Sequence, residues 1–134
     1  MGLFHFSGTR PANLGVAAGK LSPGDRKPNW VSSQAPSSDR KHFIEPLRFS
    51  GTAESAWKAL EKVVSPMPGA TFVTKAPGYL HVEFASALMG FVDDVEFALD
   101  AGAGAIHVRS GARLGFSDLG VNRKRIEAIR AALR

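Results

Sequence analysis

Apolar and polar residues alternate along the second half of the chain, and this alternation with a period of two predicts β-strands. ATFVTK (70–75) and YLHVEFA (79–85) flank a short turn that contains proline and glycine. FVDDVEFAL (91–99) and AIHVRS (105–110) flank a second turn, DAGAG. The pattern therefore predicts two successive β-hairpins, each with one apolar and one polar face.

Two segments show helical spacing instead. Residues 53–64 place apolar side chains on one face after Thr52, a plausible N-cap, and Pro66 follows the end of the helix. The second helix follows Asp118, which is expected to be its N-cap. Its apolar stripe is expected to comprise Leu119, Asn122, Ile126, Ile129 and Leu133.

Residues 1–40 are rich in Gly, Pro, Ser and Asn and show no sustained period, which predicts an irregular N-terminal arm. Trp30 is its expected anchor, so we expect the arm to be packed on the domain or tethered to it. HFIEPLRF (42–49) reads as a short edge strand interrupted at Pro46. Residues 41–134 then form a single α+β domain of order β-α-β-β-β-β-α, with two helices covering a mostly antiparallel four- to five-stranded sheet.

Composition narrows the functional classes. The 134 residues include no Cys, which excludes disulfides, zinc knuckles and thiolate nucleophiles. No secretory signal or apolar run long enough to span a membrane is visible, so cytoplasmic residence is the default expectation. The formal charge of +5 favours anionic partners, and basic residues gather between Arg109 and Arg134. Nucleic acid is not favoured, because little aromatic interleaving accompanies the basic residues.

Several blocks in order, RPANLGV, PNWVSSQA, HFIEPL, GFVDDVEF and HVRSGARLGFSDLGVNRKRIE, resemble the family known as domain of unknown function 1499. The resemblance covers almost the whole chain, and it implies no established activity. Relatives occur in bacteria and plastid-bearing organisms, and some look membrane-attached. Family members carry cysteines beside the Pro-Asn step, where Trp30 stands here, so a thiol-dependent role does not transfer to this chain.

If residues 100–103 form the second turn, Leu99 pairs with Gly104, and two rows of polar side chains cross the sheet. The rows are Glu83, Asp94, Arg109 and His81, Glu96, His107. The second row has the ligand types of a metal site. Its members lie nearly in line across about 10 Å, however, which favours a solvated, charge-paired sheet face instead. No metal and no cofactor are therefore expected.

Asp93 falls on the apolar face, where an ionised carboxylate needs a partner. Arg113, Arg123, Arg125 or backbone amides at the start of the last helix could provide it, which would make Asp93 a structural clasp. Alternatively, Asp93 is a tuned acid beside an anion-binding pocket. The loop 110–118 could also cradle a phosphate or carboxylate, although Asp118 would compete for the same amides.

These features favour a non-catalytic module that binds an anionic or amphiphilic ligand, or a protein partner. An anionic membrane surface is one form of such a partner. The candidate ligand-binding residues are Asp93, Asp94, Arg109, Arg113, Asp118, Asn122, Arg123 and Arg125. Two alternatives remain: a small enzyme with Asp93 or Glu96 as general base and an arginine anchoring an anionic substrate, or a structural domain whose arm docks elsewhere.

Overall fold

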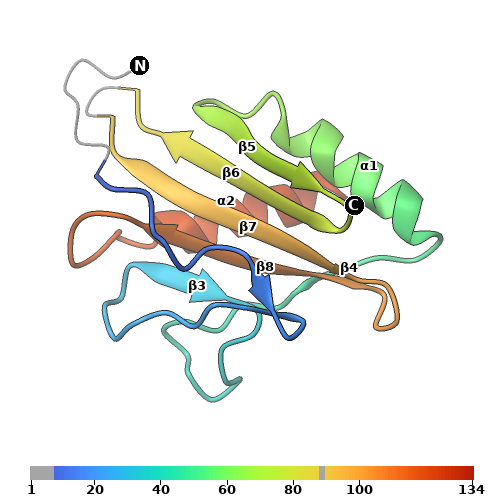
Figure 1. Cartoon of the computed structure of the whole chain (residues 1–134), viewed down its shortest axis with the longest axis horizontal. Helices are drawn as coiled ribbons and strands as arrows, with labels where there is room; N and C mark the ends of the chain where they lie inside the picture. The colour runs from blue at the N-terminus through green and yellow to red at the C-terminus, as the bar shows by residue number, and fades with distance from the viewer. Residues whose placement is uncertain (1–7, 88–89) are drawn as a thin grey trace.

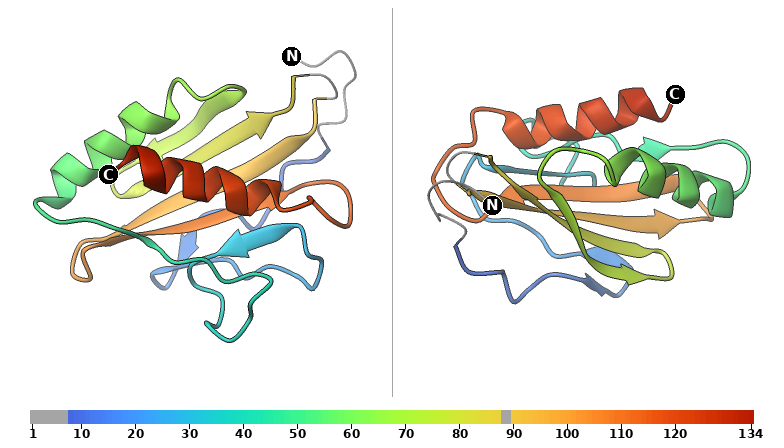
Figure 2. Two further views of the ribbon diagram at one scale, coloured as in Figure 1. Left: turned by 180° about the vertical axis from the view of Figure 1, so that it is seen from behind. Right: turned by 90° about the horizontal axis from the view of Figure 1, so that it is seen from above.

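The computed structural model describes residues 8–87 and 90–134 and has three layers (Figures 1 and 2). Two helices lie on one face of an antiparallel sheet, and the N-terminal segment runs across the other face. The elements are β1 (Val16–Ala17), β2 (Lys20–Leu21), β3 (Trp30–Ser32), β4 (Leu47–Arg48), α1 (Ala53–Val64), β5 (Ala70–Ala76), β6 (Tyr79–Ala85), β7 (Val92–Asp100), β8 (Ala105–Ala112) and α2 (Val121–Ala132). The predicted α+β class is confirmed.

The main sheet has six strands in the order β3-β8-β7-β6-β5, and β4 also pairs with β8. It is larger than predicted because β3, inside the expected irregular arm, joins its edge through Trp30 opposite Gly111. β1 and β2 form a separate two-stranded ribbon. Within HFIEPLRF, only Leu47–Arg48 forms a strand, while Phe43 makes an isolated bridge to Ser32.

The hydrophobic core lies between the sheet and the two helices. The strands contribute alternate side chains, as the period of two predicted, and each helix contributes one stripe. The buried cluster comprises Val31, Ile44, Leu47, Leu60, Val64, Leu80, Val82, Phe84, Val95, Phe97, Ile106, Val108, Ile126 and Ile129. Across the described ranges, neither helix is long and apolar enough to cross a bilayer.

The two helices begin differently. In α1 the Thr52 hydroxyl accepts the Ser55 N–H at 3.1 Å, as predicted for an N-cap. α2 begins only at Val121, so the prediction that Leu119 belongs to its apolar stripe is wrong: Leu119 has a φ of 54° and is 86% exposed. Asp118 is not the N-cap residue, but its carboxylate still accepts the Asn122 N–H at 3.1 Å.

The register of the β7–β8 hairpin also differs from the prediction. Leu99 pairs with Ile106 rather than Gly104, because the turn occupies residues 101–104. The Asp100 carboxylate accepts the Ala103 N–H, and Gly104 adopts a φ of 62°, which favours glycine. The shift of two residues leaves each side chain on its predicted face but gives it a different neighbour.

A matched pair of leucine substitutions tests this account of the core. Leu60→Ala should lower the free energy of unfolding by about 2 to 5 kcal/mol, because Leu60 is fully buried on the face of α1 that packs in the core. Leu119→Ala should change it by less than about 0.5 kcal/mol. Urea denaturation measures both values, and equal effects would contradict the packing described here.

Candidate functional site

Strand β7 carries carboxylates on both faces of the sheet. Asp93 bonds to Arg125 of α2 on the helix side, whereas Asp94 and Glu96 lie on the side crossed by the N-terminal segment. The predicted candidates are therefore not one site. Asp93, Asp118, Asn122 and Arg125 meet on the helix side, while Asp94, Arg109 and Arg113 lie on the opposite side.

On the helix side, Asp93 pairs with Arg125, one of its predicted partners. Arg125 Nη2 donates to Asp93 Oδ2 at 2.7 Å, and both side chains are largely buried. The same guanidinium lies 4.7 Å from the centroid of the Phe84 ring. Arg125 therefore joins α2 to β7 by an ion pair and to β6 by a cation–π contact.

Asn122 links this pair to the rest of the fold. Its Oδ1 accepts bonds from Ser110 Oγ at 2.5 Å and from Arg125 Nη1 at 2.7 Å. Its Nδ2 donates to Asp118 Oδ2 at 2.8 Å and to the Asn29 carbonyl at 3.3 Å. The side chain is fully buried, so it holds the start of α2 in place rather than facing a ligand.

An open cleft of about 1030 Å³ lies beside this cluster, between the start of α2 and the adjoining ends of β5, β6 and β7. Asp93 and Arg125 line it together with apolar side chains that include Met67, Phe84 and Leu114. The cleft thus combines an apolar surface with a neutralised acid–base pair, a composition typical of small-molecule sites.

Arg123 lies in neither cluster. Its Nη2 donates to the carbonyls of Arg40 and Lys41 at 3.3 Å each, so it fastens α2 to the segment that precedes β4. It therefore has a backbone-binding role in the fold, different from the anion-binding role considered from the sequence.

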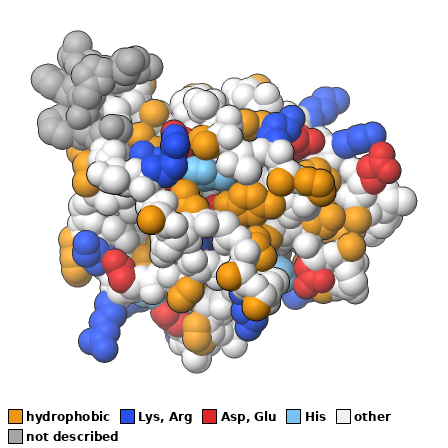
Figure 3. Space-filling model, in the orientation of Figure 1, with side chains coloured by type: hydrophobic (Ala, Val, Ile, Leu, Met, Phe, Trp, Pro, Cys, Tyr) orange, Lys and Arg blue, Asp and Glu red, His pale blue; other side chains and the backbone are white. Residues whose placement is uncertain are grey.

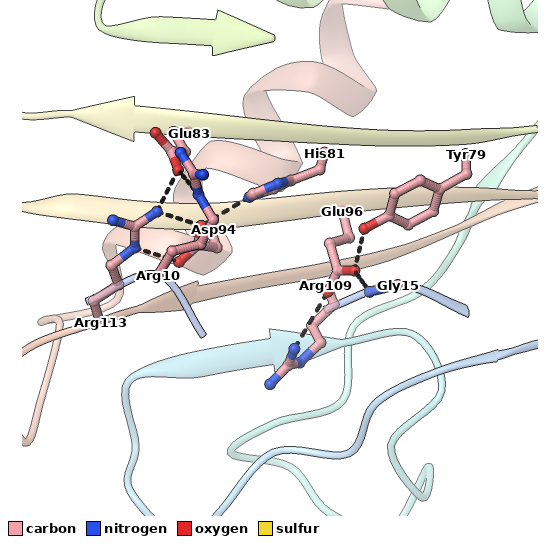
Figure 4. A network of polar contacts seen from close by, with 9 residues as sticks. All are labelled: Arg10, Gly15, Tyr79, His81, Glu83, Asp94, Glu96, Arg109 and Arg113. Atoms are coloured by element: carbon pink, nitrogen blue, oxygen red, sulfur yellow. Dashed lines mark hydrogen bonds and ion pairs between the residues drawn. The ribbon is translucent and has the colours of Figure 1, made fainter. Parts of the chain in front are cut away.

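On the opposite face, Asp94 is the centre of a network of ion pairs (Figure 4). Arg113 Nε and Nη2 donate to its two oxygens at 2.7 and 2.9 Å, and His81 Nε2 lies 2.8 Å from Oδ1. Glu83 accepts bonds from Arg113 and from Arg10 of the N-terminal segment. The prediction that Arg109 sits opposite Asp94 is wrong, because the register places Gly111 there.

Glu96 is held in the same layer. Its Oε2 accepts bonds from the Tyr79 hydroxyl and, at 2.7 Å, from the Gly15 N–H, while Oε1 accepts one from Arg109 Nη1 at 3.2 Å. Glu96 is only 1% exposed. This face of the sheet was expected to be charge-paired and solvated. It is charge-paired, but it is not solvated, because the N-terminal segment covers it.

The predicted row of His81, Glu96 and His107, a weak candidate for a metal site, does not form. Arg109, not His107, pairs with Glu96, and His107 instead lies 3.0 Å from Ser33 Oγ. Single atoms of His81, Glu83 and Asp94 do come within 4.8 Å of one another. Arg113 donates to both of those carboxylates, however, and so already supplies the cation that they need.

Adjacent carboxyls on β7 have opposite pKa shifts. Burial raises the pKa of Asp93 above its ordinary value, and the charge and hydrogen bond of Arg125 only partly offset this. Burial acts in the same direction on Asp94, but hydrogen bonds from Arg113 and His81 outweigh it, so the pKa of Asp94 is lowered. Burial and the bond to Glu96 raise the pKa of Tyr79.

Tyr79, Arg10 and Gly15 were not identified from the sequence. Tyr79 shares the alternation of His81 and Glu83, so the strand period contains the signal that places it on this face. Arg10 and Gly15 belong to an aperiodic segment, and no local pattern connects them to carboxylates more than 70 residues away.

On the face shown in Figure 3, acidic, basic and apolar side chains are interspersed.

The fold and its two polar clusters define an α+β protein. It has a ligand-sized cleft on the helix side of the sheet and a charge-paired face, covered by the N-terminal segment, on the other side. The chain belongs to the family DUF1499, described as a protein of unknown function, whose family model matches residues 20–133. This confirms the resemblance found in the sequence. No curated protein and no solved structure matches the chain.

Replacing Asp93 and Asp94 singly by asparagine should change the acid sensitivity of folding in opposite directions. The lowered pKa of Asp94 adds stability above the ordinary value of about 3.9, and this is lost as the pH falls through the folded value. The raised pKa of Asp93 means that its protonation favours the folded state as the pH falls.

We therefore expect Asp94→Asn to reduce, and Asp93→Asn to increase, the loss of stability between neutral pH and about pH 3. Urea unfolding midpoints at the two pH values measure this. Glu54→Gln, at an exposed carboxylate on α1, is the control and should follow the wild type. Shifts of the same sign in both aspartate variants would refute the assignment of the two environments.

Proposed function

We propose that this protein is a non-catalytic binding module that takes an amphiphilic ligand with an anionic head in the cleft beside α2. The observation that carries the proposal is the cleft itself, which joins an apolar lining to basic side chains of α2. Its volume of about 1030 Å³ matches the upper range of small-molecule sites, roughly 300 to 1,000 Å³.

The apolar part of the ligand would lie against Met67, Phe84 and Leu114. The apolar surface also continues outside the cleft, because Leu114 and Val121 at its edge are exposed and the nearby loop exposes Phe116 and Leu119. Clustered exposed apolar side chains mark interaction sites, since folding alone gives no reason to leave them in water.

The anionic head would meet Lys124 rather than Arg125. Arg125 is already neutralised by Asp93 and bonded to Asn122, so a ligand would have to break a buried ion pair to use it. Lys124 lines the cleft, is exposed, and forms no ion pair within the described part of the chain. It can therefore bind a carboxylate or phosphate head without disturbing the fold.

Calorimetric titration with dodecanoate below its micelle concentration tests this proposal. Leu114→Glu places a negative charge, the same sign as that of dodecanoate, in the apolar lining. Lys124→Glu replaces the cation that would bind the carboxylate by an anion. Each substitution should therefore weaken binding at least about tenfold, or 1.4 kcal/mol. Val73→Glu and Lys62→Glu are matched controls at exposed sites outside the cleft and should bind like the wild type.

Dodecyl maltoside, with the same chain length and a neutral head, should bind more weakly than dodecanoate and should be insensitive to Lys124→Glu. The proposal fails if the wild type does not bind dodecanoate, or if the control variants lose binding as strongly as the cleft variants do.

A second candidate is a small enzyme with Asp93 as general base, and the raised pKa of Asp93 beside the cleft favours it. Glu96 is a poorer base for any substrate, because it is buried under the N-terminal segment. Asp93→Asn separates the two candidates: an enzyme would lose its turnover, whereas a binding module would keep its affinity for dodecanoate or gain some, because Arg125 in the cleft loses its anionic partner.

A further inference from the structure

We propose that a second cavity, between the N-terminal segment and β8, binds a small oxyanion through the guanidinium of Arg109. This goes beyond the function proposed above, since Arg109 lies on the opposite face of the sheet from the α2 cleft. The oxyanion is a carboxylate or a phosphate, because both offer two acceptor oxygens at the spacing of the guanidinium donors.

The cavity has a volume of about 360 Å³, within the range of small-ligand sites. The N-terminal segment provides one wall, with Asn13 and Leu14, and the loop that precedes β3 provides another, with Lys27. Arg109 and Arg113 of the β8 region complete it. The site therefore exists only when the N-terminal segment lies on the sheet.

Arg109 lacks acceptors in this position. Its side chain is 16% exposed, and its hydrogen bond to Glu96 is a single one of 3.2 Å. Its Nε is buried and has no hydrogen-bond partner among the described residues. A buried donor without an acceptor costs roughly 1 to 3 kcal/mol, and more when the group is charged.

The nearby carboxylates cannot supply the missing acceptor. Glu96 already uses its second oxygen for Tyr79 and Gly15. Asp94, which also lines the cavity, accepts from Arg113 through both oxygens and from His81. Because Nε is buried, an acceptor from outside the chain would bond to the exposed part of the Arg109 guanidinium, without displacing either carboxylate.

The charged side chains that line the cavity are Lys27, Arg109, Arg113, Asp25 and Asp94. The ion pair between Arg113 and Asp94 cancels one charge of each sign, and Arg109 is paired with Glu96 through a single bond of 3.2 Å. A small anion in the cavity would therefore be attracted mainly by Arg109 and Lys27, in a partly enclosed space where attraction is screened less than at the surface.

The test follows the side-chain Nε–H signals of the arginines by ¹⁵N NMR in the full chain, titrated with sodium phosphate or sodium acetate. Sodium chloride holds the ionic strength constant. We expect a saturable shift of the Arg109 signal, identified by its loss in Arg109→Lys, and a much smaller shift of Arg113 Nε, which is bonded to Asp94. The anion that shifts the Arg109 signal more strongly identifies the ligand class, phosphate for phosphates and acetate for carboxylates.

Arg109→Lys keeps a cation beside Glu96 but removes the guanidinium, so calorimetry should show no saturable anion binding. Lys27→Gln should weaken anion binding several-fold. Because it leaves the hydrogen bonds of Glu96 intact, this variant can still test the proposal if Arg109→Lys does not fold. Lys41→Gln, outside the cavity, and Leu114→Glu, in the other cleft, should bind as the wild type does. An Arg109 signal that does not shift, or that responds no more than to chloride, overturns the proposal.

Discussion

The structure depends on the need to neutralise carboxylates that β7 buries on both of its faces. A buried ionised carboxylate is very unfavourable unless a hydrogen-bonded cation accompanies it. Each carboxylate finds that cation on a different element: Asp93 on α2, Asp94 after β8 and Glu96 on β8. One strand thereby fixes the positions of the last helix, the neighbouring strand and the loop between them.

Ion pairs of this kind specify an arrangement more than they stabilise it. The desolvation of two charges cancels much of their attraction, while the loss of one partner leaves the other exposed to the full penalty. The apolar cluster under α1 and α2 therefore supplies most of the folding free energy. The charged layer decides which strand neighbours, which helix position and which path of the N-terminal segment are compatible with that core.

The sequence contained the fold class, because hydrophobic alternation and helical spacing are local properties of the chain. It also placed Asp93 on the apolar face and named Arg125 among its partners, which required only the strand period. The turn geometry was not accessible, since choosing residues 101–104 depends on the side chain of Asp100 and the conformation of Gly104. That choice moved Arg109 from Asp94 to Glu96 and took His107 out of the row of His81 and Glu96.

The path of the N-terminal segment has a consequence for synthesis of the chain. Arg10 and Gly15 bond to Glu83 and Glu96, so they are made 73 and 81 residues before their partners. Until β6 and β7 have been made, Arg10 and Gly15 have no carboxylate partners, and the N-terminal segment has no sheet face to cover. The face of the sheet opposite the helices is lined by ionisable groups, so water can hydrate it before the N-terminal segment covers it. A chain whose N-terminal segment is not yet in place therefore exposes a hydrated surface to neighbouring molecules, and not an apolar one that would promote aggregation.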